Sequence, residues 1–240
     1  MISKFIAIEG IDGVGKSTQI KLLIDYLESE AIKTKYIHFP RNHEGVFGEL
    51  ISKFLRGEFG DVKNVHPQLV ALIFAGDRKE FSDTIREWLN EGYFVLVDRY
   101  VLSNIAFQCA KLKNSSEKIE LRNWIYMFEY EYNKIPKPDI SIYLDVPVSF
   151  THKSLSEKRN GNERKYLNGK DDIHEKDIEL QTTVKDEYEK LVKTEMNITR
   201  IVCYNSKNEI KSIKEIHEQI ISSISNLITL IKPGSPHSVL

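Results

Sequence analysis

The stretch KFIAIEGIDGVGKSTQ, residues 4–19, decides the fold. Its apolar run Phe5–Ile8 is typical of a buried strand, and acidic residues, glycines, a lysine and two hydroxyls follow directly. The G-x-x-x-x-G-K-S spacing that begins at Gly10 is the pattern of a phosphate-binding loop. A chance glycine-rich turn is the alternative, but this pattern follows a strand and precedes a helix expected to begin near Lys16, which is the context that a phosphate-binding loop requires.

The residue types in this loop suit a bound nucleoside triphosphate. Glycines let the backbone approach an anion closely, and the loop N–H groups and the helix N-terminus then face the phosphates. Lys16 can reach the outer phosphates, and Ser17 offers a hydroxyl to Mg²⁺. Asp12 is unusual here, because a carboxylate would repel the phosphates. We expect it to face a hydroxyl or the metal's hydration shell, or else to cap neighbouring loop amides.

The rest of the chain alternates strand and helix patterns. Five apolar runs predict strands, at Phe5–Ile8, Lys35–Phe39, Tyr93–Val97, Ile140–Leu144 and Arg200–Cys203. The segments between them have helical spacing, and isoleucines and a leucine from Ile210 to Ile231 predict a closing amphipathic helix. This order predicts an α/β fold, with a mainly parallel sheet covered by helices on both faces.

Length and composition indicate one soluble globular domain. The chain has 240 residues, of which 41% are hydrophobic and 29% charged, and we expect a domain over 1–231 and a flexible tail over 232–240. Residues 156–172 are polar and highly charged, which fits either a mobile lid or a solvated loop. A net charge of -1 argues against a nucleic acid or membrane partner. Without a long apolar run or a signal peptide, we expect a cytoplasmic protein, with its two cysteines buried rather than bridged.

Three further clusters carry charged and aromatic residues at strand ends or on one helix face. In YFVLVDRYVLSNIAFQ, residues 93–108, a predicted strand ends in Asp98 and Arg99, an acid suited to Mg²⁺ beside a base suited to phosphate. A local salt bridge is the alternative. FPR, residues 39–41, ends the second strand, and LIFAGDR, residues 72–78, puts Phe74 and Arg78 four apart on one helical face. Those two could address one flat ligand, although Phe74 could equally be a core residue.

With these pieces in order, the chain resembles the thymidylate kinase family. EGIDGVGKSTQ, FPR, FAGDR, DRYVLSNIAFQ and PKPDISIYLDV occur in the family's order and at similar spacing, over about residues 4–220. Adenylate and UMP/CMP kinases carry a different glycine loop, and deoxynucleoside kinases usually show Glu-Arg-Ser where this chain has Asp-Arg-Tyr. The resemblance implies a P-loop NTPase fold of three α/β/α layers with a five-stranded sheet and a lid. It implies a homodimer that transfers the γ-phosphate of ATP to dTMP with Mg²⁺.

The resemblance also implies roles for single residues. The ATP cradle would comprise Gly13, Val14, Gly15, Lys16, Ser17 and Thr18. Asp98 would organise Mg²⁺ together with Ser17, and Arg99 would bridge the two nucleotides' phosphates. Asp12 would face the 3′-hydroxyl of dTMP.

The predicted dTMP pocket is lined by aromatic and polar side chains. Phe74 would stack on thymine with Phe39 nearby, and Arg78 would donate to a thymine carbonyl. Asn104 would bond the imide edge of the base, and Phe107 would press against C2′ and disfavour a ribose hydroxyl.

Three positions depart from the family pattern. Arg41 follows FP directly, and we expect it to contact phosphate or brace the pocket. Gly13 stands where many eukaryotic members carry an arginine, so the missing charge is expected from the lid. The candidates there are Arg159 and Arg164, with Lys158 and Lys165 behind them. One register of the lid brings His174 to the nucleotide and another brings Tyr166, while an exposed histidine at a helix entry is also consistent.

Two other functions fit part of this pattern. One is a nucleoside monophosphate kinase of different or broader base specificity. The other is a catalytically silent nucleotide-binding homologue, which the intact set of Lys16, Ser17, Asp98 and Arg99 argues against.

Overall fold

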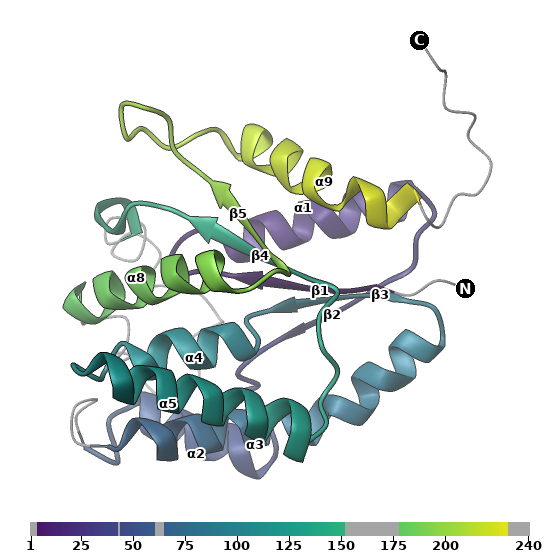
Figure 1. The fold of residues 1–240 in the computed structure, drawn as a ribbon. Coiled ribbons are helices and arrows are strands. Elements are labelled where there is room, and N and C mark those ends of the chain that lie inside the picture. Colours follow the sequence, from purple (N-terminus) through teal and green to yellow (C-terminus); the bar gives the residue numbers. More distant parts are fainter. Residues whose placement is uncertain (1–3, 43, 61–64, 152–177, 230–240) are drawn as a thin grey trace.

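The computed structural model describes residues 4–42, 44–60, 65–151 and 178–229, and these form a parallel sheet between two layers of helices (Figure 1). The strands are β1 (Lys4–Glu9), β2 (Thr34–His38), β3 (Phe94–Asp98), β4 (Ile140–Asp145) and β5 (Ile198–Val202). Their order across the sheet is β2-β3-β1-β4-β5, and every pairing is parallel. The predicted α/β fold is confirmed. β5 begins at Ile198, two residues before the predicted start.

The continuous apolar runs mark the strands that are covered on both faces. All five residues of β3 are buried, as are five of the six in β1, because each of these strands has a neighbour on both sides and helices above and below. β2 lies at the sheet edge, where Tyr36 is 42% exposed. The carboxyl ends of β1 and β3 therefore lie side by side in the middle of the sheet, on the side where the strands end. Ligands bind at this carboxyl-terminal side in open α/β sheets.

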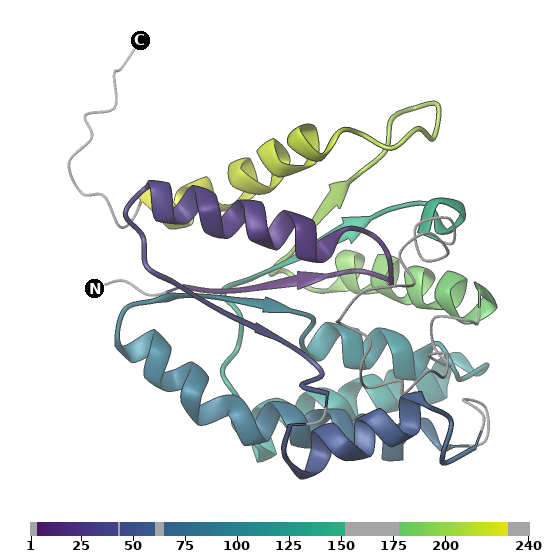
Figure 2. The ribbon, with the colours of Figure 1, turned by 180° about the vertical axis from the view of Figure 1, so that it is seen from behind.

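Helices cover the two faces unequally (Figures 1 and 2). One face carries α1 (Lys16–Ser29) and α9 (Ile213–Thr229), which pack against each other. The other face carries α3 (Pro67–Asn90), α4 (Val101–Cys109), α5 (Ser115–Tyr126) and α8 (Ile178–Thr194), with α2 (Gly45–Leu55) packed on α3. The predicted three-layer arrangement is thus confirmed.

The closing helix begins later than its apolar pattern indicates. Ile210 pairs with Tyr204 in an isolated antiparallel bridge, and α9 starts at Ile213. Ser212 and Glu215 set this start, because the Glu215 N–H donates to Ser212 Oγ (3.2 Å) and the Ser212 N–H donates to Glu215 Oε2 (2.8 Å). This reciprocal pair is a capping box.

α5 continues into a π-helical segment, η1 (Met127–Tyr132). The wider turn buries Glu129 completely, although its neighbour Met127 is 46% exposed. Such π-helical turns occur often at functional sites, and Glu129 belongs to the site described below.

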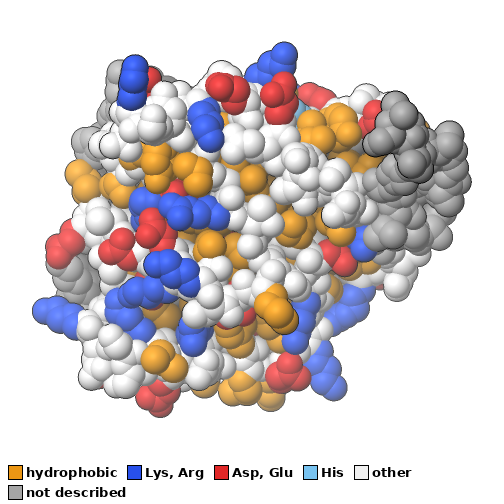
Figure 3. All heavy atoms as spheres, turned by 45° about the horizontal axis from the view of Figure 1, so that its top comes forward, with side chains coloured by type: hydrophobic (Ala, Val, Ile, Leu, Met, Phe, Trp, Pro, Cys, Tyr) orange, Lys and Arg blue, Asp and Glu red, His pale blue; other side chains and the backbone are white. Residues whose placement is uncertain are grey.

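Both cysteines, Cys109 and Cys203, are buried and unbridged, as expected. None of the helices in the described ranges is both long and apolar enough to cross a bilayer. On the face drawn in Figure 3, outside the grey atoms, basic, acidic and apolar side chains are interspersed.

Candidate active site

The loop between β1 and α1 wraps the end of the first strand, and glycine is required at two of its positions. Gly10 has φ +147°, and a Cβ there would lie 3.0 Å from the Leu144 carbonyl oxygen and 3.1 Å from Val14. Gly15 has φ +90° and is the N-cap of α1. The predicted cradle, from Gly13 to Thr18, therefore leads directly into the first turn of a 14-residue helix, whose N–H groups attract anions.

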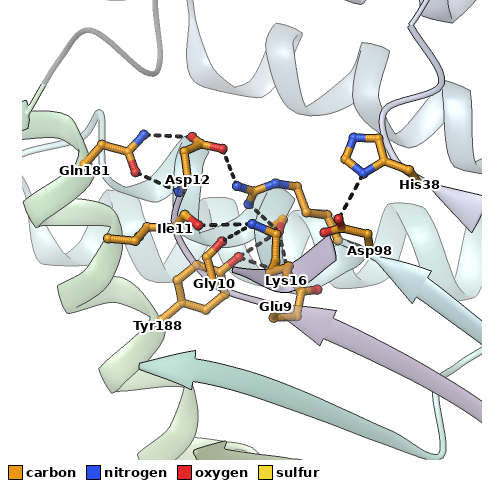
Figure 4. A network of polar contacts seen from close by, with 11 residues as sticks. Glu9, Gly10, Ile11, Asp12, Lys16, His38, Asp98, Gln181 and Tyr188 are labelled. Carbon is orange, nitrogen blue, oxygen red and sulfur yellow. Dashed lines mark hydrogen bonds and ion pairs between the residues drawn. The ribbon is translucent and has the colours of Figure 1, made fainter. Parts of the chain in front are cut away.

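Lys16 folds back over this loop (Figure 4). Its Nζ donates to the carbonyl oxygens of Ile11 (3.0 Å) and Gly10 (3.4 Å), and the residue is 7% exposed. Burial lowers the pKa of the Lys16 ammonium, and the charge of Arg99 acts in the same direction. A poorly solvated cation at the mouth of an anion cradle is suited to phosphate binding.

Asp98 ends β3 beside this lysine. Burial acts to raise the pKa of Asp98, but the charge of Lys16 and the His38 contact outweigh it, so the pKa lies below its ordinary value. His38 Nδ1, from the end of β2, lies 3.3 Å from Asp98 Oδ2. Asp98 Oδ1 is buried and, within the described residues, has no hydrogen-bond partner. An ionised carboxylate with one oxygen unused fits a role toward a cation or its water.

These groups fit a Mg²⁺ ion that is bound mainly by the nucleotide phosphates and only partly by protein side chains. Within the described ranges, no group of three or more His, Cys, Asp or Glu side chains is arranged to hold a metal ion. Mg²⁺ is commonly bound by one or two protein ligands together with substrate phosphates and water. The Asp98 carboxylate and the exposed Ser17 at the start of α1 are of that kind.

Arg99 adopts a strained backbone conformation with φ +67°, which non-glycine residues rarely occupy. Its N–H donates to the Ile8 carbonyl oxygen (2.9 Å), and its guanidinium donates from Nη2 to Asp12 Oδ1 (2.6 Å) and from Nη1 to Ser103 Oγ (3.1 Å). Burial acts to lower the pKa of Arg99, but nearby carboxylates, Asp12 above all, hold it above its ordinary value. Backbone strain of this kind clusters at functional sites.

Asp12 is engaged by residues on both sides. Besides Arg99, its carboxylate accepts from Gln181 Nε2 on α8 (2.9 Å), and its own N–H donates to Gln181 Oε1 (3.2 Å). The structure therefore shows an Asp12 carboxylate directed toward Arg99 and α8. The predicted contact with the sugar 3′-hydroxyl stays a prediction.

Glu9 lies beneath the loop and is completely buried. It accepts from the Tyr100 N–H (2.9 Å), from Ser103 Oγ (2.5 Å) and from Tyr188 OH (3.0 Å). Burial raises the pKa of Glu9 above its ordinary value even though these hydrogen bonds favour the charged form. No role was predicted for Glu9, although an acid that ends a buried strand is itself a signal in the sequence.

A second group of polar residues comes from α3, α4 and η1. Arg78 donates to Glu129 from Nε (2.6 Å) and from Nη2 (2.5 Å), and both residues are buried. The third guanidinium nitrogen of Arg78, Nη1, takes no part in this pair. Asn104 Nδ2 donates to the same carboxylate (2.9 Å) and to the Ala71 carbonyl oxygen (3.1 Å). Two acceptors fix the orientation of this amide, and its Oδ1 is buried without a partner among the described residues.

The predicted aromatic residues differ in burial and in what they pack against. Phe107 is 6% exposed, and its ring centre lies 5.0 Å from Arg99 Cζ. Phe74 is half-buried and packs edge-on against Phe54, with 6.4 Å between ring centres. Phe39 lies in the hydrophobic core against Phe81 and Tyr100. The contacts of Phe74 and Phe39 with thymine stay predictions.

Arg41 is surrounded by acidic residues. Its Nε donates to Asp77 Oδ1 (2.9 Å), its N–H to Asp77 Oδ2 (2.9 Å) and its Nη2 to Glu80 (3.1 Å). These contacts tie Arg41 to α3 and favour the bracing role over phosphate contact. The lid candidates lie outside the described residues, and so do both residues of the register question: Arg159, Arg164, Lys158, Lys165, His174 and Tyr166.

A glycine loop follows the first strand of a parallel sheet, and an Asp-Arg pair follows β3, which is the neighbour of that strand in the sheet. Together they define a P-loop nucleotide-binding phosphotransferase. A sequence model of the family described as thymidylate kinase matches residues 8–220. This chain belongs to the thymidylate kinase family.

Individual relatives agree over most of the chain. A probable thymidylate kinase from Methanococcus aeolicus is 33% identical over 231 residues, covering 93% of this chain and 96% of that protein. A thymidylate kinase from Plasmodium falciparum is 33% identical over 147 residues, covering 61% of this chain and 63% of that one. The solved thymidylate kinase from Candida albicans, described as having broad substrate specificity, matches with a TM-score of 0.67 and 26% identity, over 94% of this chain and 92% of that chain.

Proposed function

We propose that this chain transfers the γ-phosphoryl group of ATP to the 5′-phosphate of dTMP, giving ADP and dTDP for dTTP synthesis. Family membership makes the protein a kinase of this type. The observation that carries the base assignment is the pairing of Arg78 and Asn104 on one buried carboxylate, Glu129.

This pairing suits the edge of thymine. Thymine presents one imide N–H between two carbonyl oxygens. Asn104 Oδ1, which has no hydrogen-bond partner among the described residues, is an acceptor for that N–H, and Arg78 Nη1, which takes no part in the pair with Glu129, is a donor for a carbonyl. Cytosine presents an acceptor and an amino donor instead, so it would leave both protein groups facing like groups, which is costly in a buried site.

The proposed site residues correspond to the three parts of a nucleotide, which are phosphate, sugar and base. Arg99 holds the phosphate end, and the Phe107 ring lies against it where the sugar would be. Asn104 lies one turn of α4 from Phe107, on the same helical face, and carries the base end. Because Arg99 bonds Asp12 of the glycine loop, this assignment supports dTMP binding with its phosphate toward that loop.

Catalysis then needs alignment and charge compensation. The acceptor oxygen of a nucleotide phosphate is already ionised near neutral pH, so a strong general base is not required. Lys16 and Arg99 neutralise charge on the transferring group, and the loop orients the donor for in-line transfer. Asp98 and Ser17 would hold Mg²⁺, which would supply charge neutralisation on the ATP phosphates when bound.

The remaining roles are proposals from the sequence. Residues 156–172 form a lid whose Arg159 and Arg164 complete the positive field, and His174 approaches the nucleotide. We also propose a cytoplasmic homodimer without a nucleic acid or membrane partner. Exposed apolar side chains on α2 and α3, Val46, Leu69 and Leu72, provide a surface for the second copy. Light scattering after size exclusion tests the dimer.

The base and sugar assignment predicts a ranking of acceptors. With ATP and Mg²⁺, we expect kcat/KM for dTMP to exceed that for UMP about tenfold to a hundredfold, because Phe107 opposes a 2′-hydroxyl. A coupled ADP-release assay over dTMP, dUMP, dGMP and UMP measures this. Equal use of UMP and dTMP would contradict the role of Phe107, and tight ATP binding without transfer to any monophosphate would favour a silent homologue.

A further inference from the structure

Two polar side chains on α8 are buried against the catalytic edge of the sheet. Gln181 is 3% exposed and Tyr188 is 1% exposed. They are seven residues apart, about two helical turns, so they share one face of α8. Buried polar groups are costly unless they are hydrogen-bonded. The partners of Gln181 and Tyr188 both contact Arg99.

Each of them contacts a residue that binds Arg99. Gln181 Nε2 donates to Asp12 Oδ2 (2.9 Å), and Asp12 Oδ1 accepts from Arg99 Nη2 (2.6 Å). Tyr188 OH lies 2.7 Å from Ser103 Oγ, which accepts from Arg99 Nη1 (3.1 Å). Figure 4 shows Gln181 and Tyr188 approaching the network from the same helix.

Glu9 orients the hydroxyl groups of Ser103 and Tyr188. Its Oε2 accepts from both Ser103 Oγ and Tyr188 OH. Ser103 and Tyr188 each have one hydroxyl proton, and both donate it to Glu9. Glu9 therefore holds the two hydroxyls side by side and leaves the Ser103 lone pairs facing the Arg99 guanidinium. Burial and the charge of Glu9 hold the pKa of Tyr188 well above its ordinary value, so its hydroxyl remains a donor.

We propose that α8 positions the Arg99 guanidinium, through Gln181 and Asp12 at one terminal nitrogen and through Tyr188, Glu9 and Ser103 at the other. Gln181 and Tyr188 are positioning residues, since neither touches Arg99 directly in these contacts. Fixing both nitrogens removes rotational freedom from a flexible side chain before substrates bind, which is how preorganised sites gain rate. The inference rests on the proposed function for the catalytic role of Arg99.

A double-mutant cycle tests it. We expect Tyr188→Phe and Gln181→Met each to lower kcat about fivefold to twentyfold, with KM for ATP changed less than twofold. In the Arg99→Ala background, each should lower kcat less than twofold further, because the group that they position is gone. Tyr143→Phe is the matched control, since Tyr143 is equally buried and stacks on Tyr188 at 4.8 Å, and its kcat should stay within twofold.

A second readout does not depend on turnover. In the wild-type chain, a guanidinium held at both nitrogens should give separate, slowly exchanging Nη proton signals of Arg99 by NMR, and Tyr188→Phe and Gln181→Met should broaden them. Equal losses of kcat in both backgrounds, or unchanged Arg99 signals in both variants, would overturn the inference. If a thermal melting curve shows that one of these two variants does not fold, the result with the other variant decides whether the inference holds. Inactivity of the wild-type chain on dTMP alongside the expected NMR changes would count against the proposed function only.

Discussion

Replacing Arg99 with alanine is expected to lower kcat for dTMP phosphorylation by at least about a hundredfold. The loss corresponds to about 2.7 kcal/mol of transition-state stabilisation, the scale of removing one preorganised donor. Arg99 is 8% exposed, so water screens its charge poorly. Its backbone is also held in a strained conformation, with φ +67°. Steady-state kinetics with saturating ATP and dTMP measure the change.

An arginine outside the site provides the control. Arg86 on α3 bonds Asp83 at the surface, and Arg86→Ala should keep kcat within twofold. Titration calorimetry should find that Arg99→Ala still binds ATP with a Kd within a few-fold of wild type, because the loop and Lys16 remain. Turnover near the wild-type value in the Arg99→Ala variant would exclude Arg99 from the transition state.

Local patterns made much of the fold predictable. A buried strand, a glycine loop and a helix start are encoded within residues 4–19, so the position of the phosphate cradle followed from neighbouring residues alone. The same holds for Asp98 and Arg99, which directly follow an apolar run at a strand end. Parallel pairing then brings these strand ends to one edge.

Long-range partners could not be read from the sequence. Asp12 and Gln181 are 169 residues apart, and Arg78 and Glu129 are 51 apart, so no local pattern joins them. Glu129 was hidden further by a π-helical segment, which shifts side chains away from ordinary helical spacing. The structure therefore adds a buried carboxylate that contacts Arg78 and Asn104, the residues proposed to bind the base, and that the family motifs do not name.

Removing that anion is expected to have the largest effect on stability. In Glu129→Ala, the free energy of unfolding should fall by about 3–5 kcal/mol, because Arg78, 2% exposed, would be left as an uncompensated buried cation. Asn104 Nδ2 would also lose one of its two acceptors. This is a large share of the roughly 5–15 kcal/mol of a typical domain. Urea unfolding followed by circular dichroism measures it.

Two comparisons separate the buried charge from other causes. Glu131, in the same helical segment, is 72% exposed at its side chain and pairs with Lys137, so Glu131→Ala should change the free energy of unfolding by less than about 1 kcal/mol. The double replacement Arg78→Met with Glu129→Leu removes both charges and should recover most of the lost stability. It should still raise KM for dTMP, because Arg78, the proposed donor to thymine, is gone. A Glu129→Ala variant as stable as wild type would show that the Arg78 charge is solvated or compensated elsewhere. Glu129 would then not be the group that stabilises buried Arg78.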